Sequence, residues 1–319
     1  MRFGGFSIFV VCVLGLLRVS AQQPPVFRGT SEVVPVFVTV IDKDGRLVTK
    51  LGRDAFELRD DGKPQPITQF DDTPRPIRLI VMLDVSASME GNLPLLRAAS
   101  QQLIGRLGPD DVARIGTFGR EVTISSTFTR DADTLLASLP DSIAPDAPTP
   151  LWRAIDQAMD TFGQDSESRP VILVLSDGKD FVPPSFRQRT VSQAEVIDRA
   201  RKEEVMIYGV GMRSRPRQQT MPPGIGPGAL QAMLMADFPD PGLARVAEET
   251  GGGYAEIRFG QDLGAAFARV ADELHSQYLL GFAPPKRDGK THNISVRMVR
   301  GGLTPRGRKS YIAPKGESR

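Results

Sequence analysis

The chain has 319 residues, of which 24% are charged and 40% are hydrophobic, a composition typical of folded domains and not of a disordered chain. Its 40 lysines and arginines nearly balance its 38 aspartates and glutamates, so nothing indicates the basic surface that nucleic-acid binding needs. The single cysteine, Cys12, lies in the apolar N-terminal segment. Outside that segment, disulfides, cysteine catalysis and thiolate metal sites are therefore excluded.

The first 21 residues have the layout of a secretory signal peptide. Arg2 precedes a mostly apolar run that ends at Leu17, and small residues follow shortly before position 22. The run is shorter than the roughly 20 residues of a membrane-spanning helix, although an uncleaved anchor stays an alternative. Residues 22–31 are predicted to be a flexible leader. We therefore expect a bacterial protein that is exported to the periplasm or secreted, with no transmembrane span after cleavage.

Residues 32–70 are predicted to form a small β-rich module. Two turns that contain Asp-Gly, at 42–45 and 60–63, separate apolar runs, and this pattern is typical of β-hairpins. The predicted strands of this module cover residues 34–41, 46–51, 56–59 and 67–70. The segment 71–76, which contains two prolines, is predicted to be a linker.

From residue 77 to residue 280, apolar strand patterns alternate with amphipathic helix patterns. This alternation predicts an α/β fold with a doubly wound, mostly parallel sheet and helices on both faces. Buried strands are predicted at 79–83, 112–118, 171–175 and 205–212, with a hairpin partner at 121–128. Helices are predicted over 95–107, over 151–162, from a capping box at 192–195, from 241 to 251, and over 263–278.

The C-terminal segment, residues 281–319, returns to β character. Strands are predicted at 278–282, 293–299 and 309–313. Because β segments lie at both ends of the α/β core, the two can pair into one sandwich. The order of the elements also allows two separate β modules.

Three oxygen-bearing residues, Asp84, Ser86 and Ser88, directly follow the apolar run 79–83. Such a run predicts a strand that is buried on both faces, as in a parallel sheet. Open α/β sheets bind their ligands beyond the carboxyl ends of their strands. Carboxylate and hydroxyl oxygens suit a hard divalent cation, above all Mg²⁺, with Mn²⁺ or Ca²⁺ as other candidates.

The segment Asp84-Val85-Ser86-Ala87-Ser88 resembles the D-x-S-x-S motif of the von Willebrand factor A domain. The metal-ion-dependent adhesion site of that family also uses a Thr and a second Asp, which correspond here to Thr149 and Asp177. The resemblance covers roughly residues 75–280. It implies that the hydroxyls bind the ion directly or, with the aspartates, through water, and that an open position takes a carboxylate from a partner.

Each of these residues also has a simpler interpretation. Ser86 or Ser88 could cap a helix, Thr149 with Pro150 fits a helix N-cap and first position, and Asp177 could form a turn. Their joint occurrence at predicted strand ends favours the metal site. Asp146 and Asp180 lie close to the predicted ligands in sequence and could tune the charge of the site, but solvated loop acids are the favoured interpretation.

Three other features bear on identity and binding. The flank 56–65 and the segment 277–282 resemble exported bacterial proteins described as VWFA-related, of acidobacterial type. The segment 213–239, rich in Arg, Pro and Met, is either a surface for partner contact or an insertion without a role. Trp152 either lines the binding rim or packs its helix against the core.

Enzymatic activity is not expected. His275 and His292 are far in sequence from the predicted metal ligands, and the motifs of serine hydrolases, P-loop enzymes and zinc proteases are absent from the sequence. We predict cation-dependent binding of a carboxylate on a protein or an acidic surface polymer, as in cell adhesion. The alternatives are a structural or assembly component of the cell envelope with a vestigial metal site, and a metal-dependent hydrolase.

Overall fold

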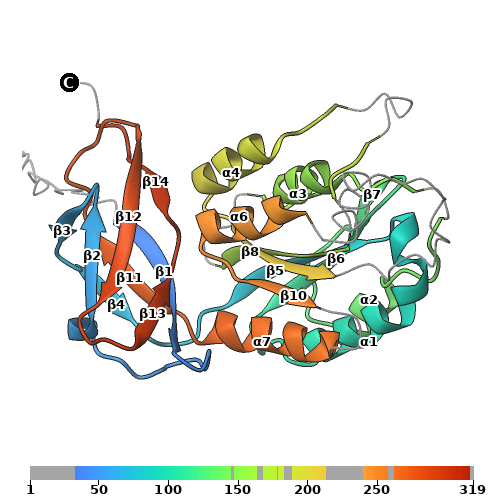
Figure 1. The fold of residues 1–319 in the computed structure, drawn as a ribbon, viewed down its shortest axis with the longest axis horizontal. Helices are drawn as coiled ribbons and strands as arrows, with labels where there is room; N and C mark the ends of the chain where they lie inside the picture. The colour runs from blue at the N-terminus through green and yellow to red at the C-terminus, as the bar shows by residue number, and fades with distance from the viewer. Residues whose placement is uncertain are drawn as a thin grey trace, which may run out of the picture. The chain divides into compact units, whose positions relative to one another are not determined.

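The computed structural model describes residues 33–144, 147–163, 168–177, 179–182, 189–212, 240–257 and 262–316. The predicted signal peptide and leader, and the segment 213–239, lie outside these residues. Residues Glu32–Arg319 make one unit, which contains a six-stranded sheet with helices and a pair of four-stranded sheets (Figure 1). Among the described residues, no helix is both long and apolar enough to cross a membrane.

The six-stranded sheet has the order β10-β9-β8-β5-β6-β7, in which only β7 runs antiparallel to its neighbour. Its strands are β5 (Ile77–Asp84), β6 (Val112–Phe118), β7 (Val122–Ile124), β8 (Arg169–Ser176), β9 (Met206–Met212) and β10 (Tyr254–Ile257). After β5 the chain moves to β6 on one side, and it later crosses to β8 on the other side. The sheet therefore changes winding direction between β5 and β8, where open α/β sheets bind ligands.

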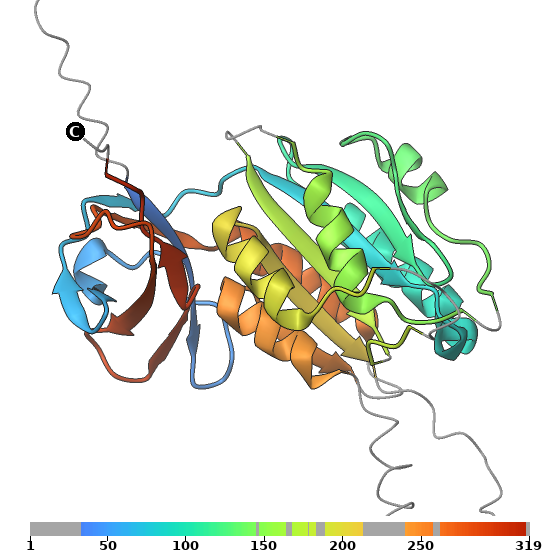
Figure 2. The ribbon, with the colours of Figure 1, turned by 90° about the horizontal axis from the view of Figure 1, so that it is seen from above.

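Helices cover both faces of this sheet, as Figures 1 and 2 show. One face carries α1 (Leu93–Ile104), α2 (Ala132–Ala137) and α7 (Leu263–His275), and the other carries α3 (Leu151–Asp160), α4 (Gln193–Lys202) and α6 (Pro241–Thr250). A hydrophobic core lies on each face of the sheet, and alternate residues of β5 point into one or the other. Leu79 and Val81 pack toward α1 and α7, whereas Ile80 and Met82 pack toward α3 and α4. The predicted doubly wound α/β fold is confirmed.

Local signals in the sequence set where these helices begin and end. The predicted capping box opens α4: the Ser192 hydroxyl accepts a hydrogen bond from the backbone N–H of Glu195, and the Glu195 carboxylate accepts one from the N–H of Ser192. Asp240 caps α6. Gly251 ends α6 with φ of 85°, a left-handed conformation that favours glycine.

The β segments from both ends of the chain pair into one sandwich. One of its sheets has the order β13-β1-β11-β4 and the other β14-β12-β2-β3. Their bounds are β1 (Val34–Asp42), β2 (Phe56–Asp60), β3 (Lys63–Gln65), β4 (Gln69–Asp71), β11 (Tyr278–Phe282), β12 (Thr291–Met298), β13 (Leu303–Arg306) and β14 (Ser310–Ile312). β1 pairs with β11 and β13, and β2 pairs with β12. This pairing decides between the two arrangements that the order of the elements allows.

The sandwich differs from the prediction in its short segments. The predicted strand over 46–51 is reduced to one bridge between Ile41 and Leu47. The predicted strand over 67–70 is shifted to β4, and the unpredicted β3 before it belongs to the other sheet. Pro66, which has no N–H for a strand ladder, lies between them. The short elements α2, β10 and β13 were not predicted either.

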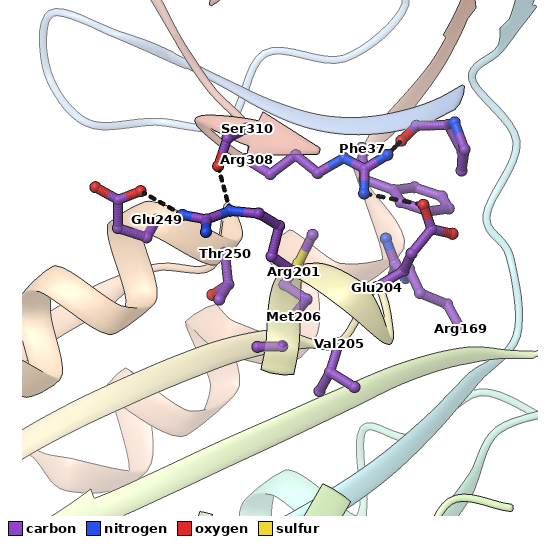
Figure 3. Close-up of a pocket in the computed structure, with 12 residues that line it drawn as sticks. Phe37, Arg169, Arg201, Glu204, Val205, Met206, Glu249, Thr250, Arg308 and Ser310 are labelled. Atoms are coloured by element: carbon purple, nitrogen blue, oxygen red, sulfur yellow. Dashed lines mark hydrogen bonds and ion pairs between the residues drawn. The ribbon is translucent and has the colours of Figure 1, made fainter. Parts of the chain in front are cut away.

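Buried polar groups join the sandwich to the α/β part. The Gln277 amide donates hydrogen bonds to the hydroxyls of Thr39 (3.0 Å) and Tyr208 (3.2 Å), and it accepts one from Arg169. Arg308 donates to the backbone carbonyl of Pro35 at 2.6 Å. A cavity lined by Arg169 and Arg308 lies beside these groups; its volume of about 30 Å³ leaves room for roughly one water molecule. Figure 3 shows residues that line it.

Candidate metal centre

The carboxylate of Asp84 ends β5 and is completely buried. One of its oxygens, Oδ1, accepts a hydrogen bond from the backbone N–H of Ser86 at 2.8 Å. The other, Oδ2, accepts one from the hydroxyl of Ser176, the last residue of the neighbouring strand β8. The parallel register of β5 and β8 brings these two strand ends together. The carboxylate therefore has a fixed orientation at the edge where the sheet changes winding direction.

The next three predicted ligands follow in a chain of close oxygen contacts. The hydroxyls of Ser86 and Ser88 are 3.1 Å apart, and the Ser88 hydroxyl donates to Oδ1 of Asp177 at 2.6 Å. Ser86 and Asp177 are buried, whereas Ser88 is exposed. The group therefore reaches solvent at Ser88, and Asp84 lies beneath it.

Backbone hydrogen bonds hold the loop that carries Thr149. The N–H and carbonyl of Thr149 pair with the carbonyl and N–H of Phe181, at 3.0 and 2.9 Å. Two residues earlier, the carbonyl of Ala147 accepts a hydrogen bond from the N–H of Ala87, between the two serines. The loop that carries Thr149 is thus attached both to the Ser86–Ser88 segment and to the chain that follows Asp177.

The simpler interpretations of the hydroxyls are not what the structure shows. Ser86 precedes the short helix η2 (Ala87–Asn92), but its side chain makes no capping hydrogen bond. Pro150, and not Thr149, occupies the N-cap position of α3. Asp177 directly follows β8, and because Gly178 lies outside the described residues, the turn interpretation of Asp177 stays open. Neither Ser86 nor Thr149 is explained by a role at a helix end.

The electrostatics of the group favour a bound cation. Burial, and then the nearby charge of Asp177, raise the pKa of Asp84 from 3.8 to about 7, although the hydrogen bonds from Ser176 and Ser86 act in the opposite direction. A negative charge at Asp84 is therefore costly unless a positive charge lies close to it.

The donor set also fits Mg²⁺. This ion takes oxygens at about 2.1 Å in an octahedron, which places neighbouring ligand oxygens roughly 3 Å apart. The contacts of 3.1 Å and 2.6 Å along Ser86, Ser88 and Asp177 are close to that spacing.

Sequence reasoning missed Ser176 as the group that orients Asp84. The available signal was a hydroxyl directly before Asp177, at the end of a buried strand.

The interpretation of Asp180 as a solvated acid is wrong. Its carboxylate is partly buried and accepts a hydrogen bond from the N–H of Trp152 at 3.2 Å, and its pKa is raised by burial and by Asp240.

Trp152 packs α3 against the core. Its side chain is only 6% exposed and belongs to the hydrophobic cluster beneath α3, α4 and α6. The packing interpretation is therefore the one that the structure supports. The segment 213–239 begins after Met212 at the end of β9, but it lies outside the described residues and its two interpretations stay open.

Comparison with known families identifies the domain that carries this site. Residues 79–179 match the family model of the von Willebrand factor type A domain, and this range includes Asp84, Ser86, Ser88, Thr149 and Asp177. The chain therefore contains a von Willebrand factor type A domain, a class of domain that commonly binds partners through a metal-ion-dependent adhesion site.

Several solved structures are similar to the chain. The conserved hypothetical protein BatB from Bacteroides thetaiotaomicron is 16% identical, with 62% of this chain and 98% of that chain covered and a TM-score of 0.45. A von Willebrand factor type A protein from Catenulispora acidiphila is 12% identical, with 90% and 76% covered and a TM-score of 0.46. The mussel byssus protein PTMP1, described with a zinc-occupied MIDAS motif, is 18% identical, with 68% and 49% covered and a TM-score of 0.43. No curated protein sequence matches the chain.

Proposed function

We propose that the protein is an exported binding module that captures a carboxylate of a partner through a divalent cation. The observation that carries this proposal is the chain of oxygens at the carboxyl edge of the sheet. The hydroxyls of Ser86 and Ser88 are 3.1 Å apart there, and the Ser88 hydroxyl is 2.6 Å from the carboxylate of Asp177. The buried carboxylate of Asp84 interacts with that of Asp177 through its charge.

Each residue has a defined part in this proposal. Ser86, Ser88 and Thr149 offer neutral oxygens to the ion, and Asp84 and Asp177 offer the negative charge that attracts it. Mg²⁺ is the expected ion, although Mn²⁺ or Ca²⁺ would be accepted by the same oxygen donors. When bound, the ion supplies a positive charge that attracts an incoming carboxylate. Exposed Ser88 marks the side from which a partner can approach.

Binding is favoured over hydrolysis by the positions of the two histidines. His275 at the end of α7 contacts the Asp111 carboxylate at 2.7 Å, and His292 lies in the sandwich among three carboxylates. Both are engaged away from Asp84, so neither is placed to act there as a general base. We therefore propose that the protein is not an enzyme.

The proposed location is the periplasm or the medium of a bacterium, on the strength of the signal-peptide pattern in residues 1–21. The proposed relatives are the exported VWFA-related proteins of acidobacterial type, on the strength of segments 56–65 and 277–282. The proposed partner is a protein or an acidic surface polymer that presents a carboxylate.

A pull-down from an envelope extract of the source organism tests this function. The immobilised full chain is compared in Mg²⁺ and in EDTA, beside Asp84→Asn, with one portion of the extract treated so that its carboxylates are amidated. We expect a partner that is retained only by the unchanged chain, in Mg²⁺, from untreated extract. Equal retention by Asp84→Asn, or retention that survives amidation, would contradict the proposal.

A further inference from the structure

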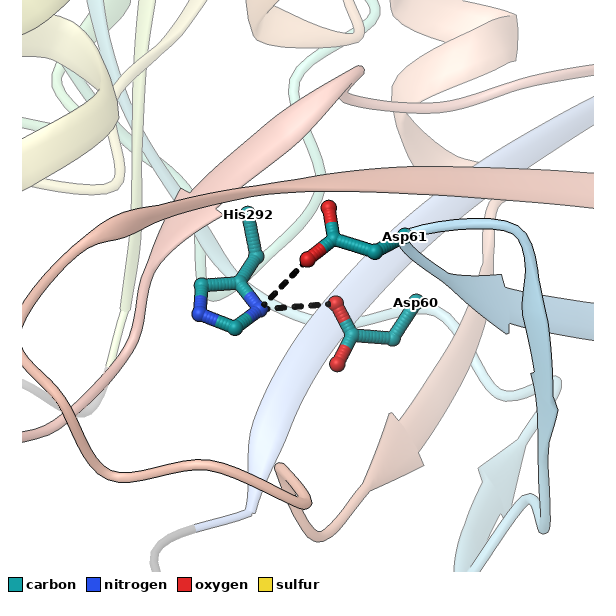
Figure 4. A group of neighbouring side chains, drawn as sticks. All are labelled: Asp60, Asp61 and His292. Atoms are coloured by element: carbon teal, nitrogen blue, oxygen red, sulfur yellow. Dashed lines mark hydrogen bonds and ion pairs between the residues drawn. The ribbon is translucent and has the colours of Figure 1, made fainter.

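A second group of metal-binding side chains lies in the sandwich, outside the von Willebrand factor A domain. Asp60 ends β2, Asp61 begins the turn to β3, and His292 lies on β12, which pairs with β2. Figure 4 shows both carboxyl groups pointing at the same nitrogen of His292. Asp60 and His292 are buried, although 232 positions separate them in sequence.

Both ring nitrogens of His292 face carboxylates. Nδ1 is 3.2 Å from Oδ1 of Asp60 and 3.2 Å from Oδ2 of Asp61, while Nε2 is 3.2 Å from Oδ1 of Asp288. A neutral imidazole has one N–H and one lone pair. If the N–H on Nε2 donates to Asp288, the lone pair on Nδ1 points at two negative groups. A positive charge must then lie between Nδ1 and the two carboxylates.

The distances in this group are compatible with a metal ion in that position. Charge-assisted N–H···O hydrogen bonds are about 2.7–2.9 Å long, and a single proton on Nδ1 would be shared between two acceptors at greater length. Zinc binds His nitrogen and carboxylate oxygen at about 2.0–2.2 Å, so neighbouring ligands of a tetrahedral ion are roughly 3.3 Å apart. The two contacts of 3.2 Å are close to that ligand spacing.

The surroundings hold these groups in place. The other oxygen of Asp61 accepts the backbone N–H of Asn293 at 3.0 Å, which turns Oδ2 toward His292. Asp288 faces the far nitrogen of the ring, as carboxylates do behind metal-binding histidines. This outer contact would fix the tautomer that leaves the Nδ1 lone pair available.

Tyr311 on β14 gives an independent indication of a missing ligand. Its hydroxyl is buried and makes no hydrogen bond of normal geometry in the described part of the chain, and its ring centroid is 5.5 Å from that of His292. Burial raises the pKa of this phenol, and the charge of Asp60, an interaction of the hydroxyl with that carboxylate, and the charges of Asp61 and Asp288 raise it further, so the hydroxyl lies near the same cluster. A buried hydroxyl without a partner is costly, and a metal-bound water would satisfy it.

We propose that Asp60, Asp61 and His292 form a binding site for Zn²⁺, with Asp288 positioning His292 and Tyr311 facing the fourth position. The mixed nitrogen and oxygen donors suit Zn²⁺ better than Mg²⁺. A bound ion would fasten the β2–β3 turn to β12, and thus the N-terminal part of the sandwich to its C-terminal part. The site is independent of the one at Asp84.

Calorimetric titration of Zn²⁺ into the metal-stripped full chain tests this site, with saturating Mg²⁺ present to fill the Asp84 site. We expect one Zn²⁺ per chain. His292→Gln removes a ligand and should abolish this binding, whereas Asp288→Asn should weaken it about 10- to 100-fold, as loss of an outer partner does. His275→Gln is the matched control, because it removes the other histidine, and it should bind like the unchanged chain. Asp84→Asn should also keep its Zn²⁺.

X-ray absorption of the Zn²⁺-loaded chain keeps the test decisive if His292→Gln does not fold. We expect one imidazole and two or three oxygens around the ion. The proposal is overturned if the unchanged chain binds no Zn²⁺ in Mg²⁺, if folded His292→Gln binds as tightly as the unchanged chain, or if the spectrum contains no imidazole. Failure of the Asp84 site in its own test would leave each of these results intact.

Discussion

Replacing Asp84 with Asn should make the metal-free protein more stable at pH 8. Asn keeps the shape of the side chain, accepts the N–H of Ser86 with its oxygen, and can donate to the hydroxyl of Ser176. It removes only the buried charge. The pKa of Asp84 is raised from 3.8 to about 7, chiefly by burial and then by Asp177, so the folded chain binds a proton more tightly than the unfolded chain.

The sign follows from that difference. Between pH 4 and pH 7 the folded state holds more protons at Asp84 than the unfolded state, so the unfolding free energy falls as pH rises through this range. Since one pKa unit corresponds to about 1.4 kcal/mol, the loss above pH 7 is about 4 kcal/mol at most. In EDTA at pH 8, Asp84→Asn should recover a large part of it, and below pH 4 the two proteins should be equally stable.

Urea unfolding in EDTA at about pH 3.5, 6 and 8 measures this effect, with the fluorescence of Trp152, the only tryptophan and a buried one, as the probe. Asp110→Asn, at an exposed aspartate, is the matched control and should change stability by less than about 0.5 kcal/mol. With Mg²⁺ at 100 times its dissociation constant, the unchanged chain should gain about 2.7 kcal/mol and Asp84→Asn little. If Asp84→Asn is less stable than the unchanged chain at pH 8 in EDTA, the reasoning is refuted.

Three further substitutions test the scaffold that positions the site, all by urea unfolding. Gly252→Ala should cost at least about 3 kcal/mol, because a Cβ there would lie 2.0 Å from the carbonyl oxygen of Ile207; a loss below about 1 kcal/mol would show that the backbone yields easily. Ser192→Ala should cost about 1 kcal/mol by removing the cap of α4, and an unchanged midpoint would contradict that role. Asp111 accepts hydrogen bonds from the N–H groups of Ile77 and Gly108. Although burial raises the pKa of Asp111, the contact with His275 and these bonds hold it below 3.8. Its stabilising effect should therefore be present above pH 4 and lost as pH falls further. Asp111→Asn should reduce the fall of the unfolding free energy below pH 4, and an unchanged fall would contradict the assignment.

The α/β fold was predictable because its signals are local. Each core strand is a run of apolar residues, and each major helix carries an apolar stripe or a capping residue. Their alternation along the chain predicted the layers of helices and sheet and the edge of the sheet at which the strands end. Asp84 ends such a strand, Ser86 and Ser88 come shortly after it, and Asp177 directly follows another. Their convergence required only that parallel strands end on the same side of the sheet.

The parts that escaped prediction depend on pairing at long range. The residues around Asp60 and Asp61 in sequence predict only a hairpin turn. His292 comes close to these carboxylates only because β2 pairs with β12. Ser176 was missed for a similar reason, since its role depends on the register of β8 with β5. The short strands β10 and β13 carry too few residues for a recognisable apolar pattern.

The most direct test of the central claim is calorimetric titration of Mg²⁺ into the metal-stripped full chain, beside Asp84→Ala and the matched control His292→Gln. We predict that the unchanged chain and folded His292→Gln bind one Mg²⁺ each at the carboxyl edge of the sheet, and that Asp84→Ala binds none there. Binding of Mg²⁺ by Asp84→Ala with the affinity and stoichiometry of the unchanged chain would contradict the account.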